Sequence, residues 1–324
     1  MLIKGDVFMD EIIKKILIQN KLYEENKKII NNHNKLDEFL NTYKFNLESK
    51  HKIPKDTTRD NEGRIILDEI PFIVSNKEEF LSDNKWIILN NGTKLYLKDK
   101  RTKEENILEL LIMYFLKDLN ISHANYDLAT FKDKEYLVTP SFLKNNERII
   151  FLFEKLDKIP KIDEAYQMLK KFNNDTFFLK TCFIDRIIGN ADRFPFNYGL
   201  ITGDSVNNKA KQPKNCPLFD NVDKNNIFIR NDEYYRFPYL TNKKDSSCNK
   251  VISHLLDYDE IMNFASNTLK KANLYKAAKE LLKEKGIYTD KNTYQKAQKF
   301  FIDSETIIND ELKNKGKSFK IRLT

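Results

Sequence analysis

Residues 188–201 read Ile188-Gly-Asn-Ala-Asp-Arg-Phe-Pro-Phe-Asn-Tyr-Gly-Leu-Ile201, and the run Pro217-Leu-Phe-Asp220 follows them. The first stretch is rich in turn-forming residues and places Asp192 and Asn197 five residues apart. The second stretch brings the carboxylate of Asp220 to the end of a short apolar run. Transfer of a γ-phosphoryl group needs a side chain that orients the attacking hydroxyl and oxygen ligands for Mg²⁺, and these loops offer both.

Four residues of the two loops have candidate roles. Asp192 is the candidate catalytic base, and Arg193 beside it is the candidate for neutralising charge during transfer. Asn197 and Asp220 are the candidate Mg²⁺ ligands. Alternatives remain open, because Asp beside Gly and Asn often caps a turn, and Asp223 competes with Asp220 for the metal.

Residues 65–98 are predicted to form strands, because short apolar runs flank the pair Asn91-Gly92. Asn-Gly between apolar runs favours a β-hairpin, since both residues tolerate positive φ. Lys98 closes the second strand of this hairpin and is the candidate partner of the α- and β-phosphates of ATP. Lys94 and Lys100 are the alternatives.

Residues 103–119 are predicted to form an amphipathic helix, because apolar residues recur at helical spacing. Thr102 and Glu105 have the spacing of an N-terminal capping box. Glu109 on this helix is the candidate that holds Lys98 by an ion pair, with Glu105 one turn earlier as the alternative.

The remaining patterns predict strands early in the chain and helices later, which indicates an α+β fold with a small mixed lobe (1–140) and a larger helical lobe (141–324). The boundary is placed near Pro140, because proline cannot continue a central strand. The other predicted elements are a helical pair over 8–45, helical regions over 163–188 and 250–315 with a stop at Gly286, a loop over 50–64, and strands at 126–131, 135–139, 198–202 and 226–229.

Composition excludes several classes of protein. The chain has 324 residues, three cysteines and four histidines without metal-ligand spacing, so neither a zinc site nor a disulfide framework is expected. No apolar run approaches the length of a membrane span, and the N-terminus lacks a signal-peptide pattern. The net charge is +8, but basic and acidic residues are interleaved, so nucleic-acid binding is not expected. The thiols are expected to be reduced.

Glycine-rich phosphate loops are absent from the sequence. It contains neither G-x-G-x-x-G nor G-x-x-x-x-G-K-[ST], and it contains no H-R-D or D-F-G triplet. The loop that covers the phosphates must therefore be less rich in glycine, and 75–85 and 56–64 are the two candidates.

The stretches 188–200 and 217–220 resemble the catalytic and metal loops of HipA-like serine/threonine kinases, which have a Gly-Asn/Ala-x-Asp-Arg/Gly-His-x-x-Asn core and a later Pro-x-Tyr/Phe-Asp. The resemblance implies a bilobal protein-kinase-like fold, Mg²⁺-ATP, and autophosphorylation on Ser or Thr. It implies that the hinge over 137–143, with Thr139 and Ser141, holds adenine through backbone groups. It also implies a bacterial protein, cytoplasmic or secreted into host cells as a proinflammatory effector.

Two departures from the family pattern are visible. Phe194 stands where the family usually has His, which removes any hydrogen bond of that His but leaves the base in place. The first 50 residues differ from the additional N-terminal domain of the family's toxin members, so an operator-binding toxin–antitoxin role is not expected.

Three function classes are therefore compared. The first is a serine/threonine protein kinase that uses a protein, itself included, as acceptor. The second is a phosphotransferase for a small molecule or lipid, since the loops do not identify the acceptor. The third is a non-catalytic basic interaction module. Loss of transfer in Asp192→Asn is expected of the protein kinase, and the class of acceptor that is labelled separates it from the second class. Absence of Mg²⁺-dependent nucleotide binding would favour the third class.

Overall fold

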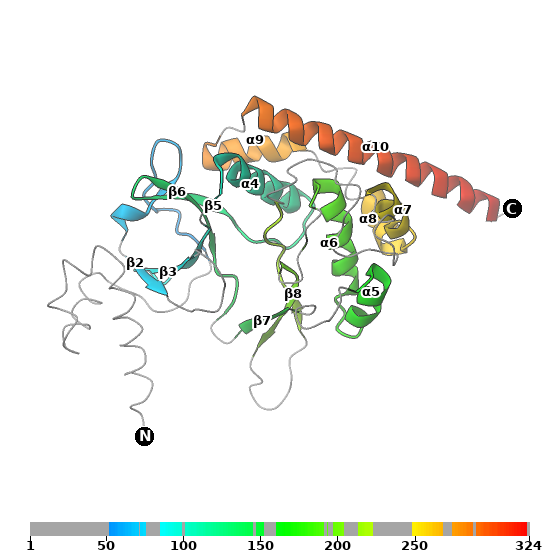
Figure 1. Cartoon of the computed structure of the whole chain (residues 1–324), viewed down its shortest axis with the longest axis horizontal. Coiled ribbons are helices and arrows are strands. Elements are labelled where there is room, and N and C mark those ends of the chain that lie inside the picture. The colour runs from blue at the N-terminus through cyan, green and yellow to red at the C-terminus, as the bar shows by residue number, and fades with distance from the viewer. Residues whose placement is uncertain are drawn as a thin grey trace, which may run out of the picture. The chain divides into compact units, whose positions relative to one another are not determined.

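The computed structural model describes residues 52–70, 72–75, 85–98, 101–144, 147–151, 160–190, 193, 197–203, 213–222, 248–267, 274–287 and 290–322. These residues form two compact units (Figure 1). The first unit comprises the described residues within 1–106 and 125–145, and the second those within 107–124 and 146–324. The helix predicted over 8–45 and the strand predicted at 226–229 lie outside the described residues.

A six-stranded sheet forms the first unit, with the strand order β1-β5-β6-β4-β3-β2. All neighbouring strands are antiparallel except β1 and β5, which are parallel. Apolar side chains from one face of this sheet form its core, because alternate residues of a strand point to the same side. The strands are β1 (Ile65–Ile66), β2 (Phe72–Ser75), β3 (Lys85–Leu89), β4 (Lys94–Lys98), β5 (Asp127–Phe131) and β6 (Lys134–Pro140).

The predicted hairpin is present between β3 and β4. The backbone N–H of Leu89 donates to the carbonyl of Thr93, and the N–H of Gly92 donates to the carbonyl of Leu89. Gly92 has a φ of 86°. Such a loop needs a residue in the left-handed region at this point, which glycine supplies at little cost. The strands predicted at 126–131 and 135–139 are also confirmed as β5 and β6, and Pro140 is the last residue of β6.

Helix α4 (Lys103–Asp118) confirms the predicted amphipathic helix and its capping box. The backbone N–H of Thr102 donates to Glu105 Oε2 over 2.6 Å, and the backbone N–H of Glu105 donates to Thr102 Oγ1 over 3.1 Å. These two bonds satisfy donors that have no partner within the helix, so the cap fixes where α4 begins.

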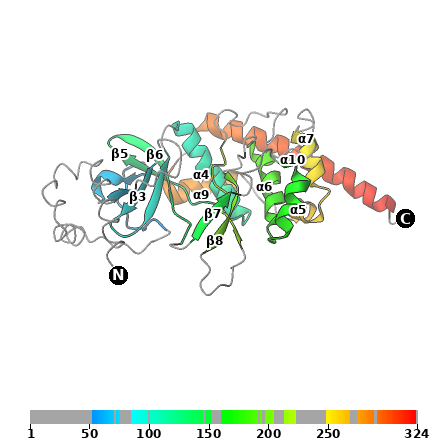
Figure 2. The ribbon, with the colours of Figure 1, turned by 60° about the horizontal axis from the view of Figure 1, so that its bottom comes forward.

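Most of α4, six further helices and a small sheet are described in the second unit. Helix α10 packs against α6, α7 and α8, and Figure 2 shows it running past them. Strands β7, β8 and β9 form an antiparallel sheet in that order. The elements are β7 (Glu147–Phe151), α5 (Ile162–Lys170), α6 (Asp175–Ile188), β8 (Gly199–Gly203), β9 (Lys214–Asn215), α7 (Cys248–Leu255), α8 (Asp259–Asn267), α9 (Leu274–Lys285) and α10 (Lys291–Arg322).

The helical structure predicted over 163–188 is confirmed as two helices, α5 and α6, with a break between them. Asn173 adopts a φ of 55° there, a left-handed conformation that ends a helix. The predicted stop at Gly286 is confirmed by its φ of 70°, and the strand predicted at 198–202 is confirmed as β8. Strands β7 and β9 were not predicted. Among the described residues, no helix combines the length and apolar character needed to cross a membrane.

Candidate active site

The end of α6 shapes the start of the candidate catalytic loop. Gly189 follows the helix with a φ of 76°, and its N–H donates to the carbonyl of Asp185. Asn190 then folds back, so that its backbone N–H donates to the same carbonyl over 2.8 Å and its Nδ2 donates to Asp185 Oδ1 over 3.1 Å. Glycine suits the left-handed position after the helix, and the Gly-Asn pair therefore turns the chain back over Asp185.

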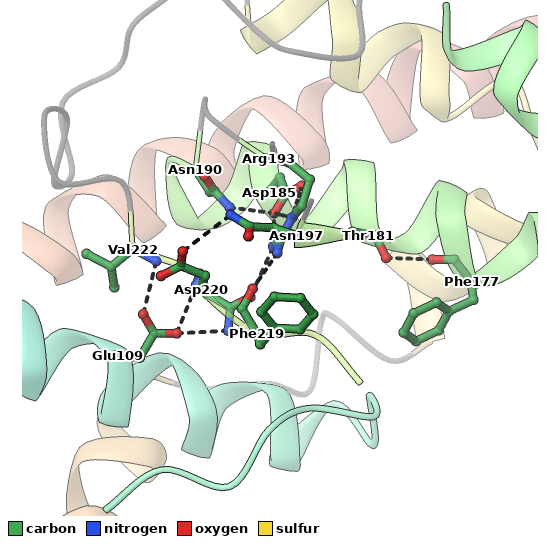
Figure 3. Close-up of polar contacts among 11 residues, drawn as sticks. Glu109, Phe177, Thr181, Asp185, Asn190, Arg193, Asn197, Phe219, Asp220 and Val222 are labelled. Carbon is green, nitrogen blue, oxygen red and sulfur yellow. Dashed lines mark hydrogen bonds and ion pairs between the residues drawn. The ribbon is translucent and has the colours of Figure 1, made fainter. Parts of the chain in front are cut away.

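Arg193 forms an ion pair with Asp185 beneath this turn (Figure 3). Its Nη2 lies 2.5 Å from Asp185 Oδ1, and its Nε lies 3.0 Å from Oδ2. Both side chains are fully enclosed, at 0% exposure. A buried bidentate pair of this kind is directional, so it fixes the loop relative to helix α6.

Arg193 also reaches the metal loop, residues 219–222. Its Nη1 donates to the carbonyl of Phe219 over 2.8 Å, and its Nη2 donates to Asn221 Oδ1 over 3.0 Å. These contacts differ from the role expected from the sequence, which was neutralisation of charge on the transferred group. An enclosed guanidinium held by protein acceptors joins the catalytic loop to the metal loop instead.

Asn197 and Asp220 lie together, as their predicted shared role requires. Asn197 Nδ2 donates to Asp220 Oδ2 over 3.3 Å. Tyr198, which follows Asn197, is buried edge-on against Phe178 with 5.3 Å between ring centroids. Burial raises the pKa of Tyr198 well above its ordinary value, so it stays neutral and acts as an apolar anchor for the end of the loop.

Glu109 holds the other side of the metal loop. Its carboxylate is fully buried on α4 and accepts hydrogen bonds from the backbone N–H of Asn221 (2.8 Å) and of Val222 (3.3 Å). Figure 3 shows this carboxylate facing the loop that carries Asp220. Sequence reasoning placed Glu109 opposite Lys98 and did not anticipate these backbone contacts.

Lys98 lies on β4 in the first unit with only 9% of its surface exposed. Its Nζ donates to the hydroxyl of Tyr126 over 3.4 Å and lies 5.0 Å from the centroid of that ring. Lys94, an alternative candidate, instead places its Nζ over the Trp86 ring at 4.6 Å. Contact with an aromatic ring stabilises a partly desolvated ammonium, and Lys98 is the more enclosed of these two cations.

Thr139 and Ser141 lie at the end of β6 and are both buried. The N–H of Ser141 donates to the carbonyl of Lys94 over 2.8 Å, and the hydroxyl of Ser141 accepts a bond from the N–H of Leu143 over 3.3 Å. The Ser141 N–H is thus already used for a backbone hydrogen bond to Lys94.

Several predicted residues fall outside the described part of the chain. They include the candidate base Asp192, the alternative metal ligand Asp223, the alternative lysine Lys100, and most of the candidate phosphate loop 75–85. The other candidate loop, 56–64, is held in the first unit by the ion pair between Arg59 and Asp127.

The donor set at Asn197 and Asp220 fits Mg²⁺. Within the described residues there is no group of three or more His, Cys, Asp or Glu that could hold a metal ion by itself. Mg²⁺ needs less, because it takes one or two protein oxygens and completes its shell with phosphates and water. The Asp220 carboxylate and the carboxamide of Asn197, whose Nδ2 lies 3.3 Å from Asp220 Oδ2, are groups of the kind that could supply such oxygens. Cys216 nearby is no alternative nucleophile, because burial raises its pKa to about 12.

Sequence reasoning missed three residues that organise this site: Asp185, Asn190 and Asn221. Asp185 had a visible signal, because it is an acidic residue within the apolar run Phe183-Ile-Asp-Arg-Ile-Ile188 of a predicted helix. Buried carboxylates of this kind are rare unless they are paired. Asn221 had no comparable signal, since it reads as a turn residue after Asp220.

Comparisons with known proteins bear on the fold. No protein family model and no curated protein matches the chain. Among solved structures, a Helicobacter pylori proinflammatory kinase, CtkA, matches with a TM-score of 0.55 and 16% identity, over 74% of this chain and 95% of that one. HipA of Shewanella oneidensis, in a toxin–antitoxin complex with HipB and operator DNA, matches with a TM-score of 0.43 and 12% identity, over 81% and 70%. The likeness to CtkA confirms the predicted α+β, kinase-like fold class.

Proposed function

We propose that the chain is an ATP- and Mg²⁺-dependent serine/threonine protein kinase. The observation that carries the proposal is the approach of Asn197 to Asp220 on two loops that the buried Arg193 joins. The candidate base Asp192 precedes Arg193 in the same loop, which is the order of groups that phosphoryl transfer requires. The kinase-like fold shared with CtkA supports this assignment.

Each residue has one role in the proposal. The Asp220 carboxylate and the Asn197 carboxamide oxygen would hold Mg²⁺, which neutralises charge on the ATP phosphates when bound. Asp192 orients the acceptor hydroxyl and accepts its proton. Lys98 binds the α- and β-phosphates, and its enclosed position strengthens that electrostatic contact.

The remaining residues position the site. Arg193 is assigned to loop positioning, because its guanidinium is enclosed by Asp185 and the metal loop. Glu109 is assigned to holding the metal loop through two backbone N–H groups. Thr139 and Ser141 are assigned to the adenine end of the nucleotide site. Protein acceptors, autophosphorylation and action as a bacterial effector in host cells complete the proposal, as the resemblance of the two loops to HipA-like kinases implies.

The test is transfer of labelled γ-phosphate from Mg²⁺-ATP by the wild type and by Asp192→Asn, with a generic protein acceptor and, in parallel, lipid and small-molecule acceptors. We expect label on the chain or on the protein acceptor with the wild type only. Asp163→Asn, the same substitution at an exposed position of α5, is the matched control and should transfer normally. Transfer by Asp192→Asn at the wild-type rate would refute the assignment of the base, and label on a lipid or metabolite alone would refute the protein-kinase proposal.

A further inference from the structure

The backbone of Asp220 adopts a conformation that must be held in place. Its φ is 54°, in the left-handed region that residues with a side chain seldom occupy. Asp tolerates this region better than most residues, but such a conformation persists only where the surrounding structure determines it. The candidate metal ligand therefore depends on contacts made by its neighbours.

Those contacts come from opposite directions. On one side, Arg193 Nη1 donates to the carbonyl of Phe219 over 2.8 Å. On the other side, Glu109 accepts from the N–H groups of Asn221 and Val222 over 2.8 and 3.3 Å. The peptide groups before and after Asp220 are thus fixed by a cation and an anion from two different elements (Figure 3).

The side chain of Asn221 joins this cation and this anion. Its Nδ2 donates to Glu109 Oε1 over 3.1 Å, and its Oδ1 accepts from Arg193 Nη2 over 3.0 Å. The orientation of the amide is determined by its partners, because a carboxylate can only accept and a guanidinium can only donate. Asn221 is 1% exposed, so water does not substitute for either bond.

Only an amide satisfies both neighbours. A carboxylate at this position would face the Glu109 carboxylate with a like charge, and an apolar side chain would remove a hydrogen bond from each of two buried charged groups. The residue after the candidate metal ligand is therefore specified by its chemistry rather than by the turn alone.

We propose that Asn221 is a positioning residue that couples Glu109 of α4 to Arg193 of the catalytic loop and so presents the Asp220 carboxylate to the metal. This rests on the proposed function, in which Asp220 is a Mg²⁺ ligand. Asn221 does not contact the metal or the nucleotide itself. Its effect is to fix the backbone on both sides of Asp220.

The test is calorimetric titration of ATP into the full-length Asn221→Asp protein, once with excess Mg²⁺ and once in EDTA. We expect the affinity in Mg²⁺ to fall by about 10–100-fold, the range found when partners that orient metal ligands are changed. The affinity for metal-free ATP should stay unchanged. An unchanged affinity in both conditions overturns the proposal, and so does an equal loss in both, which would indicate a general structural defect.

A double variant provides the rescue. The variant combines Glu109→Gln with Asn221→Asp. The amide at position 109 can then donate to the carboxylate at position 221, which reverses the native bond, and that carboxylate still lies opposite Arg193. It should regain part of the Mg²⁺-dependent affinity that Asn221→Asp loses, because a glutamine at position 109 can accept only one of the two backbone N–H bonds at positions 221 and 222. No gain would overturn the proposal. Asn263→Asp, at an exposed position of α8, makes the same substitution away from the site and should bind as the wild type does.

Hydrogen–deuterium exchange without nucleotide separates this proposal from the proposed function. The amides at positions 221 and 222 should exchange at least about tenfold faster in Asn221→Asp than in the wild type, because loss of their hydrogen bonds exposes them. If the wild type bound no ATP, the proposed function would fail while faster exchange still supported the positioning role. Unchanged exchange would overturn the positioning role whatever the ATP result.

Discussion

Replacing Asp185 by Asn removes one charge from a pair that is closed to water. The substitution keeps the size of the side chain, and its oxygen can still accept one bond from Arg193. Its NH₂ group, however, replaces an acceptor that Arg193 now contacts. The Arg193 guanidinium then stays buried without this carboxylate and keeps two neutral acceptors, the carbonyl of Phe219 and the amide oxygen of Asn221.

The magnitude follows from burial and distance. Two unit charges about 3 Å apart attract by roughly 5–6 kcal/mol at an effective dielectric constant of about 20. Removal of one partner of a buried pair costs about 3–5 kcal/mol, because the remaining charge cannot be solvated. We therefore expect Asp185→Asn to lower the free energy of unfolding by about 3–5 kcal/mol, a large part of the ~5–15 kcal/mol typical of a folded protein.

Equilibrium urea denaturation followed by circular dichroism measures this loss, and phosphotransfer at a temperature where the variant is folded measures its effect on the site. We expect kcat to fall by about a hundredfold, since small displacements of a catalytic loop have effects of this size. Asp163→Asn is the matched control. Its carboxylate is 54% exposed and pairs with His254, so its loss should cost under about 1 kcal/mol.

A loss below about 1 kcal/mol in Asp185→Asn would refute the reasoning, because it would mean that the pair behaves like one at the surface. The double variant Asp185→Leu/Arg193→Met separates stability from function. Replacing both charges by apolar groups of similar size is often neutral or stabilising. We expect it to lose less stability than Asp185→Asn, because no charge stays buried, although the Phe219 carbonyl and the Asn221 amide oxygen lose their bonds to Arg193. It should remain impaired in phosphotransfer.

Three further predictions concern single residues. Thr102→Ala removes the cap of α4 and should lower the free energy of unfolding by about 1 kcal/mol in urea titrations. Burial, with a smaller contribution from nearby Lys117, lowers the pKa of His123 below its ordinary 6.5, so the unfolded chain binds the proton more readily and the thermal midpoint should fall as the pH drops below about 6.5. His123→Gln should flatten that profile. Tyr126→Phe removes the hydroxyl that contacts Lys98 and should raise the KM for ATP about fivefold, from a net bond of ~1 kcal/mol, with kcat nearly unchanged.

Each of these has a contradicting result. An intact midpoint in Thr102→Ala would mean that packing alone fixes the start of α4. A pH profile identical in wild type and His123→Gln would assign the pH dependence to other groups. A fall in kcat without a change in KM would place Tyr126 in the chemical step rather than in nucleotide binding.

Elements specified by neighbouring residues could be predicted from the sequence. The β3–β4 hairpin follows from Asn91-Gly92, and the start of α4 follows from the capping pair Thr102 and Glu105. The approach of Asn197 to Asp220 was also predicted, because both residues lie in short loops of a pattern that requires a shared ligand. The break at Asn173 was missed, since the apolar stripe continues from α5 into α6 and periodicity does not show the left-handed turn between them.

Contacts between residues far apart in the chain could not be predicted. Glu109 and Asn221 are 112 positions apart, and nothing in the local pattern of either residue indicates the other. The sequence showed a glutamate on a helix near a lysine, and ion pairing with that lysine was the available interpretation. The contacts of Arg193 could not be predicted either. Its position beside Asp192 indicates a positive charge near the reaction, whereas its burial against Asp185 depends on how α6 packs.

Helix α4 carries Glu109, which holds the metal loop, and most of this helix belongs to the same compact unit as the loop. Chain order places α4 among the N-terminal strands, but residues 107–124 belong to the same compact unit as the loop. Glu284 of α9 accepts from the Tyr114 hydroxyl and from Lys117 Nζ, each over 2.9 Å, and so fastens α4 within that unit. Because Glu109 lies on the fastened helix, its carboxylate has a fixed position from which to hold the backbone beside Asp220. The geometry of the candidate metal ligand thus depends on α4, α6 and α9 together, and Glu109, Arg193 and Asn221, which hold the backbone beside Asp220, all lie in the second unit.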